Sequence, residues 1–226
     1  KLPKEQISSV NSVFEIDETD KIISHELFQD NGKEIYNMST DIFVVDTPYL
    51  IEKLEEEAAK EEPRKLRYVL RDLAAAEGGF AYEYTGYLSN IHSVKSYFDA
   101  NLDMLDTQKF YSLFAPNQKV YTKVKNEEPT YYSNSSDVKR SQFASGSIVR
   151  GHVEDSVVSR NVGLQEGSSV THSVVFPRVE IGKNATVNYA IIDKGVTVAD
   201  GVTIRGTENN PVVITKGSVV TEDIVR

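Results

Sequence analysis

The sequence contains no cysteine, and no run of its apolar residues approaches the roughly 20 that a membrane-spanning helix requires. Without cysteine, neither a disulfide framework nor a thiolate metal site can form. The first residues, 1–5, are mostly charged and contain no signal-peptide apolar core. We therefore expect a cytoplasmic protein with no membrane contact. Because the chain begins with Lys rather than Met, we interpret it as a fragment or a processed chain.

Positive charge is also in short supply. The 226 residues include 25 Lys and Arg against 34 Asp and Glu, which gives a net charge of −9. Nucleic acids and anionic membranes are recognised through positive surface charge, so neither is expected as a partner. Hydrophobic residues make up 39% of the chain, which is enough for a core. The length allows one large domain or two smaller ones.

Residues 147–205 repeat at a spacing of 17. Four columns of aliphatic residues align at this spacing: Val153, Val170, Val187 and Ile204; Val157, Val174 and Ile191; Val162, Val179 and Val196; and Leu164, Ile181 and Val198. A fifth column, Gly167, Asn184 and Gly201, suits a turn. Self-similarity at a fixed period indicates a solenoid, and helical repeats need a longer period of roughly 33 to 47 residues.

The dominance of Val and Ile in these columns favours strands over helices. A coil of this length accommodates three short strands around a narrow apolar interior, so the repeat predicts a parallel β-helix whose columns point inward. A β-sandwich with regular turns is the alternative. It would not keep the same chemistry in each column at a fixed offset.

Residues 1–106 alternate between strand and helix patterns. Asn31-Gly32 is a two-residue hairpin signal, and residues 42–45 are apolar enough for a buried strand. One helix is predicted from an N-cap at Thr47 to Pro63, with a solvated charged face over residues 52–62. Further amphipathic helices are predicted from Leu66 to Gly78 and from Val94 to about residue 106. Such alternation indicates α/β architecture, and it opens here without a first βα unit.

The pattern changes twice along the chain, which gives three predicted segments. Residues 1–106 form the C-terminal portion of an α/β domain. Residues 107–134 lose regular pattern, contain Pro116 and Pro129, and are predicted to be a linker. Residues 135–226 form the β-helix domain. The fold class expected is thus α/β plus all-β.

Four stretches resemble the ADP-glucose pyrophosphorylase (glucose-1-phosphate adenylyltransferase) family. Residues 86–93, Gly-Tyr-Leu-Ser-Asn-Ile-His-Ser, stand where that family has Gly-Tyr-Trp-x-Asp-Val/Ile-Gly-Thr. Residues 96–105 are similar to the family helix that follows, residues 120–122 and 129–132 to its linker, and residues 190–194 to its β-helix. The resemblance implies a sugar-nucleotidyltransferase-like α/β domain followed by a left-handed parallel β-helix.

Two positions depart from the family pattern. Asn90 replaces the motif Asp that the resemblance assigns to metal binding, and Gln29 aligns with the Lys that binds the sugar phosphate. Magnesium, which the family's catalytic members use, needs charged oxygen donors, and a neutral amide is a weaker ligand. The family's Gly-rich nucleotide loop and its upstream catalytic Asp have no counterpart. No catalytic, substrate-binding or metal-binding residue and no cofactor are therefore expected here, and Gln29 and Asn90 are degenerate motif positions.

These departures resemble the non-catalytic D-type subunit of Gram-positive bacteria. The resemblance then implies a regulatory role in glycogen biosynthesis, a catalytic partner subunit in a hetero-oligomer, expected to be a tetramer, and a sugar phosphate as candidate effector. Activity of the chain itself is left open. The alternative is the C-terminal part of an active enzyme making ADP-glucose from ATP and glucose 1-phosphate.

A sugar acyltransferase is a third hypothesis, because some β-helix enzymes use a histidine base. His152 and His172 lie in the repeat, but 20 residues apart rather than 17, so they are not expected at equivalent coil positions. His25 and His92 are isolated in the sequence. We expect His152 and His172 to be surface or turn residues, and we expect no catalytic role for His25 or His92.

Overall fold

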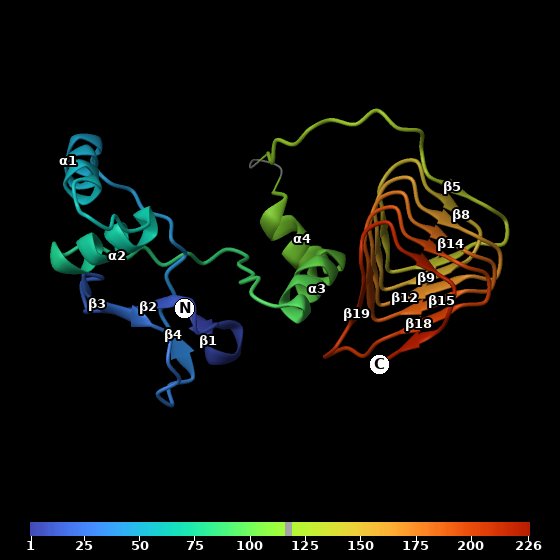
Figure 1. Ribbon diagram of the computed structural model, residues 1–226, viewed down its shortest axis with the longest axis horizontal. Coiled ribbons are helices and arrows are strands. Elements are labelled where there is room, and N and C mark those ends of the chain that lie inside the picture. Colours follow the sequence, from blue (N-terminus) through green and yellow to red (C-terminus); the bar gives the residue numbers. More distant parts are fainter. Residues whose placement is uncertain (116–118) are drawn as a thin grey trace. The chain divides into compact units, whose positions relative to one another are not determined.

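A computed structural model describes residues 1–115 and 119–226 (Figure 1). The chain divides into two compact units, Lys1–Thr85 and Gly86–Arg226. This division falls before the helix that begins at Val94, so that helix belongs with the β-helix rather than with the first 85 residues. Pro116, which the sequence assigns to the linker, lies outside the described residues.

The first unit contains two small antiparallel sheets and two helices. Its elements are β1 (Leu2–Pro3), η1 (Lys4–Gln6), β2 (Ser12–Ile16), β3 (Ile22–Leu27), β4 (Ile35–Tyr36), α1 (Thr47–Ala58) and α2 (Leu66–Ala76). β2 pairs with β3, and β1 pairs with β4. The buried side chains of Leu2, Ile7, Val13 and Tyr36 pack together as a small core.

The hairpin predicted at Asn31-Gly32 is wrong. Gly32 has the left-handed φ of 86° that a tight turn uses, but β3 and β4, on either side of the turn, pair with other strands. A two-residue turn fixes a hairpin only when the flanking strands pair directly. Here Asn31 and Gly32 lie within a longer loop over residues 28–34.

The buried strand predicted over residues 42–45 is also wrong. No strand is assigned to these residues, and the side chains of Ile42 and Val44 are 81% and 102% exposed. An apolar run becomes a buried strand only where neighbouring strands and a covering layer receive it. Among the described residues of this unit, no strand pairs with residues 42–45.

The N-cap of α1 lies one residue before the predicted one. Asp46, not Thr47, is the N-cap, and its side chain accepts a hydrogen bond from the Tyr49 N–H. The helix ends at Ala58, before Pro63. α2 matches the prediction, with Gly78 after its end at a left-handed φ of 71°.

The second unit opens with helices. These are α3 (Val94–Leu102), η2 (Asp103–Leu105) and α4 (Thr107–Leu113). α4 lies in residues for which the sequence predicts no regular structure. Asp106 initiates it by accepting hydrogen bonds from the N–H groups of Gln108 and Lys109.

The β-helix has three parallel sheets within the described residues (Figure 1). The first contains β5 (Tyr131–Tyr132), β8 (Ile148–Val149), β11 (Gly163–Leu164), β14 (Glu180–Ile181), β17 (Thr197–Val198) and β20 (Val219–Val220). The second contains β6 (Asp137–Lys139), β9 (His152–Glu154), β12 (Ser169–Thr171), β15 (Thr186–Asn188), β18 (Thr203–Arg205) and β21 (Ile224–Val225). The third contains β7 (Gln142–Phe143), β10 (Val157–Val158), β13 (Val174–Val175), β16 (Ala190–Ile192) and β19 (Val212–Ile214). Each strand pairs with its counterpart one coil later, which confirms the predicted parallel β-helix.

The first predicted column lies in the coil interior. Val153, Val170, Val187 and Ile204 are each 0% exposed, and their strands pair in register. The columns that begin at Val162 and at Leu164 belong to the same core. The interior is therefore lined by aliphatic residues that recur at the same place in each coil, as the 17-residue spacing predicts.

The second predicted column points outward instead. Val174 and Ile191 are buried against Phe98 of α3, in a cluster separate from the coil interior. Their neighbours Val175 and Ile192 point inward. Successive side chains of a strand face opposite sides, so two adjacent aliphatic residues cannot both fill the interior. α3 therefore covers the outer face of the third sheet.

The predicted turn column is confirmed. Gly167, Asn184 and Gly201 all adopt the left-handed conformation, with φ of 73°, 55° and 73°. Glycine adopts this conformation without a steric cost, and Asn tolerates it better than most residues. The corner after the first sheet is thus repeated in consecutive coils.

Candidate functional site

The two degenerate motif positions lie in different units. Gln29 is exposed in the loop after β3, in the first unit, and Asn90 is half-buried in the segment before α3, in the second. Next to Gln29, the Asp30 carboxylate accepts a hydrogen bond from the Gly32 N–H, 2.9 Å away, and lies 3.9 Å from the Lys4 ammonium. Position 29 itself supplies a neutral amide to this loop, with no charge to offer a phosphate.

Asn90 precedes the N-terminus of α3, which carries a capping box. Ser93 and Ser96 form a capping box, in which the Ser93 hydroxyl accepts from the Ser96 N–H at 3.0 Å. The Ser96 hydroxyl accepts from the N–H groups of His92 and Ser93, each at 2.9 Å. Helix N-termini bind anions through free N–H groups. The capping box engages one such group, the Ser96 N–H, together with the N–H groups of the two residues before the helix.

A charged network in the first unit includes His25, which the sequence leaves isolated. His25 Nε2 lies 2.7 Å from Asp72 Oδ1, Asp72 pairs with Arg64, and Arg64 Nε donates to Glu57 Oε1 at 2.9 Å. The Lys60 ammonium also contacts Glu57, at 2.5 Å. These residues connect β3, α2 and α1, so the network fastens three elements together.

Glu57 corrects the prediction of a fully solvated helix face. It is only 5% exposed, because Arg64 folds back over it after the helix has ended. The Arg64 guanidinium and the Lys60 ammonium hold the pKa of Glu57 well below its ordinary value of 4.5. These residues have a structural role, because the two cations keep a buried carboxylate ionised within the fold.

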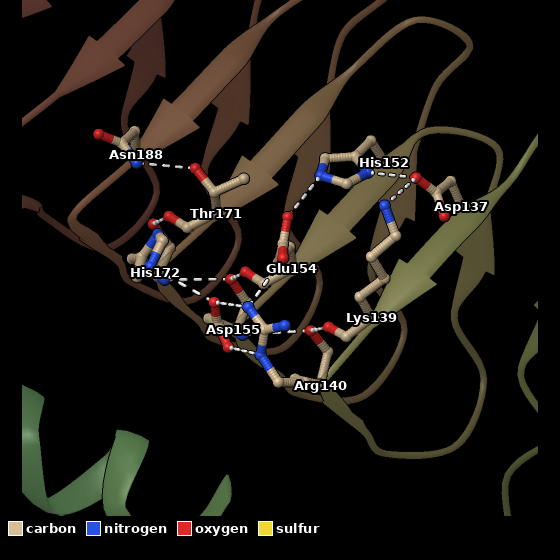
Figure 2. Close-up of polar contacts among 12 residues, drawn as sticks. Asp137, Lys139, Arg140, His152, Glu154, Asp155, Thr171, His172 and Asn188 are labelled. Atoms are coloured by element: carbon tan, nitrogen blue, oxygen red, sulfur yellow. Dashed lines mark hydrogen bonds and ion pairs between the residues drawn. The ribbon is translucent and has the colours of Figure 1, made fainter.

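A second charged group of side chains lies on one corner of the β-helix, and Figure 2 shows it in detail. We call it the corner cluster: Asp137, Lys139, Arg140, His152, Glu154, Asp155 and His172. Arg140 is its centre. Its Nε and Nη2 donate to Asp155 at 2.7 and 2.6 Å, and Nη2 also donates to Glu154 at 2.8 Å. The guanidinium lowers the pKa of Asp155.

The two histidines of the corner cluster are each paired with carboxylates (Figure 2). His152 Nδ1 lies 2.9 Å from Asp137 Oδ2, and its Nε2 lies 3.5 Å from Glu154 Oε2. His172 Nε2 lies 3.4 Å from Asp155 Oδ2. In the strand register His152 faces Ser169, so the two histidines do not occupy equivalent coil positions. Carboxylates thus hold both rings in place on the surface of the coil.

The corner cluster follows from the backbone. At this corner one residue of each coil has a left-handed φ: 40° at Arg140, 47° at Asp155, 45° at His172 and 47° at Tyr189. The coils stack at about the 4.8 Å spacing of paired strands. Side chains from this column therefore lie above one another. In the sequence these four residues are spaced 15, 17 and 17 residues apart. Their side chains differ in type, so no shared chemistry marks them as a column.

Within residues 1–115 and 119–226, no three His, Cys, Asp or Glu are grouped so as to hold a metal ion. Asn90, at the motif position of the metal-binding Asp, supplies a neutral amide, which is a weaker ligand for magnesium than a carboxylate. None of the helices over the same residues is both long and apolar enough to cross a bilayer.

Comparison with known families defines the class first. Residues 124–225 match the family model described as GlmU-like, C-terminal hexapeptide. The match covers the β-helix from before β5 to β21. Over these residues the chain is therefore similar to β-helices of the hexapeptide-repeat class.

Curated relatives then give the particular resemblance. Over 134 residues, 59% of its length, the chain is 36% identical to a glucose-1-phosphate adenylyltransferase of Bacillus cytotoxicus, and the match spans 36% of that protein. Over 129 residues, 57% of its length, it is 35% identical to that of Bacillus mycoides and 34% identical to that of Bacillus anthracis, spanning 34% of each. Over the matched residues the chain is homologous to these enzymes. It spans about a third of their length.

Proposed function

We propose that this chain is part of a non-catalytic, regulatory subunit of glucose-1-phosphate adenylyltransferase in glycogen biosynthesis. Homology to enzymes of that name supports the reaction and the family. The observation that carries the regulatory role is Asn90, which stands where the resembling family motif has a metal-binding Asp. Gln29, in place of a phosphate-binding Lys, points the same way.

The chemistry of the reaction explains why these two positions matter. Adenylyl transfer from ATP develops negative charge on phosphate oxygens, and enzymes stabilise it with magnesium and cationic side chains. Asn90 weakens the metal site, and Gln29 provides no charge for the sugar phosphate. Both changes lower stabilisation of the transition state while leaving the fold intact.

The proposed mode of action is assembly with a catalytic subunit in a hetero-oligomer, a tetramer in our hypothesis. The last coil suits docking, because β19, β20 and β21 are the outermost strands of their sheets. Val213, Val219 and Val225 on these strands are exposed. A sugar phosphate is the candidate effector. Any ligand whose affinity for the partner changes on assembly must in turn change the stability of the assembly.

The test uses the full-length polypeptide and a catalytic adenylyltransferase subunit. Each is assayed alone and then mixed at micromolar concentration, with mass measured by light scattering alongside the rate. We expect no ADP-glucose from this protein alone, an increase in mass on mixing, and a changed rate or substrate affinity of the partner. Absence of both the mass increase and the rate change would contradict the regulatory role.

Robust turnover by the full-length protein, purified free of any catalytic subunit, would favour the second candidate, an active enzyme making ADP-glucose. A glucose 1-phosphate titration of the same sample separates weak substrate binding from slow chemistry. Binding of acyl-CoA would instead support the acyltransferase hypothesis.

A further inference from the structure

The loop over residues 28–34 brings reactive groups together around Asn31. The side-chain oxygen of Asn31 accepts a hydrogen bond from the Tyr36 hydroxyl at 2.7 Å and another from the Lys33 N–H at 3.3 Å. The Tyr36 hydroxyl in turn accepts from the Asn31 N–H at 2.9 Å, which fixes its position. Tyr36 is buried, so its hydroxyl is held rather than freely rotating into solvent.

These two donors define the chemistry of the Asn31 carbonyl. Hydrogen bonds to a carbonyl oxygen draw electron density from the carbon and stabilise negative charge that develops on the oxygen during addition. The Asn31 side-chain amide is thereby prepared for attack by a nucleophile at its carbon.

The nucleophile is the next backbone nitrogen. The Gly32 N–H donates to Asp30 Oδ1 at 2.9 Å, so a carboxylate is already in place to accept its proton. The carboxylate is ionised at neutral pH, since that hydrogen bond lowers the pKa of Asp30 from an ordinary value already well below 7. Gly32 has a left-handed φ of 86°, and no atom lies within 4 Å of where a side chain would begin. Residue 32 has no side chain, and the space where one would begin is open.

We propose that Asn31 is a site of self-catalysed succinimide formation, with Asp30 as proton acceptor and Tyr36 as oxyanion donor. The Gly32 nitrogen forms a bond to the Asn31 side-chain carbon, and its proton passes to Asp30. The tetrahedral oxyanion is held by Tyr36 and the Lys33 N–H. The carbon–nitrogen bond of the amide then breaks, and Asp30 returns the proton as ammonia leaves.

Hydrolysis by water completes the reaction. It adds to one of the two succinimide carbonyls and opens the ring to aspartate or isoaspartate, so the net change is amide plus water to carboxylate plus ammonia. In either product, the loop that carries Gln29 gains a negative charge beside Asp30. Such a loop repels an anionic ligand more strongly than the unmodified one. The inference does not depend on the proposed regulatory function.

The rate of conversion at residue 31 is measured by peptide mapping with mass spectrometry on the whole chain at neutral pH, in buffer and in urea. The fold should accelerate conversion about tenfold over the unfolded chain, because a general base and an oxyanion donor each contribute at least that much in enzymes. Conversion in the folded chain that is no faster than in urea would overturn the proposal.

Two variants separate the roles. Tyr36→Phe keeps the ring that packs edge-on against Phe28 but removes the hydroxyl, and Asp30→Asn removes the proton acceptor at an exposed position. Each should slow conversion several-fold at an unchanged melting temperature. Tyr121→Phe, at an exposed tyrosine, is the matched control, and the exposed Asn134 serves as internal reference. If Tyr36→Phe fails to fold, Asp30→Asn decides, and an unchanged rate in it refutes the proposal.

Discussion

The hydroxyl of Ser173 accepts a hydrogen bond from the backbone N–H of Ala190, 3.1 Å away on the next coil. One coil earlier, Ser156 accepts from Ser173 in the same way, and Ser141 accepts from Ser156, each at 3.1 Å. Each hydroxyl also donates to a carbonyl two residues before it. Ser156 and Ser173 are both 0% exposed, so water cannot replace these bonds. The serines fasten successive coils where the chain turns the corner.

Ser173→Ala should destabilise the β-helix by about 1 to 3 kcal/mol, the cost of leaving a buried N–H without a partner. Urea unfolding followed by circular dichroism measures the loss. Ser169→Ala, on the half-exposed outer face of β12, is the control and should change stability by less than about 0.5 kcal/mol. Equal effects of the two substitutions would show that the serine column does not fasten the coils.

Val187→Asp should destabilise the β-helix by about 3 kcal/mol or more, because it buries a carboxylate with no partner in an aliphatic interior. Thr186→Asp changes the adjacent residue, which faces outward, and should be tolerated. The melting temperatures of both variants are compared with the original. An unchanged melting temperature for Val187→Asp would be incompatible with an inward-facing column.

Phe98→Ala should release α3 from the third sheet. Phe98 is buried against Val174 and Ile191, and removing a buried phenyl ring costs about 3 to 5 kcal/mol. The expected result is faster amide hydrogen exchange in α3, with little change in the coil interior. Val94→Ala, at a half-exposed position of the same helix, is the control. Uniform loss of protection across the β-helix would contradict separate packing of α3.

The network around Glu57 predicts sensitivity to acid. The pKa of Glu57 is lower in the folded chain than its ordinary value of 4.5, so the ionised form favours folding. This contribution is complete above that ordinary value and is lost as the pH falls towards the folded-state pKa.

Glu57→Gln therefore removes a pH-dependent contribution to the stability of the first unit. Between about pH 5 and about pH 3, the melting temperature of the first unit should fall less steeply in this variant than in the original protein. Glu55→Gln, at an exposed position of α1, is the control and should keep the original slope. Identical slopes for Glu57→Gln and the original would show that the Arg64 and Lys60 contacts do not favour the ionised carboxylate.

The sequence carries more information about the β-helix than about the first unit. Val153, Val170, Val187 and Ile204 reveal their common environment because each coil packs on the next at a fixed offset. Ile42 and Val44 show the opposite case. Their β-branched chemistry predicts burial, but burial depends on neighbouring strands that the described first unit does not provide.

The candidate site divides in the same way. Gln29 and Asn90 are identified by their residue type within a motif, because the loss of a charge is visible without coordinates. The corner cluster is not, since Arg140, Asp155 and His172 share only a left-handed φ. Figure 2 shows that their contacts arise from coil stacking.

The sequence by itself determined the period, the strand chemistry, the turn column and the neutral residues at two motif positions, because each is a property of residue type and spacing. Only the tertiary structure decided which aliphatic column α3 covers, that Glu57 is buried, and that Tyr36 and Asp30 converge on Asn31 and Gly32. These depend on which face of an element meets which neighbour. For α3 the neighbour is a segment distant in the chain, whereas Glu57 and Asn31 are contacted by loops that fold back on them, and no periodic pattern encodes either arrangement.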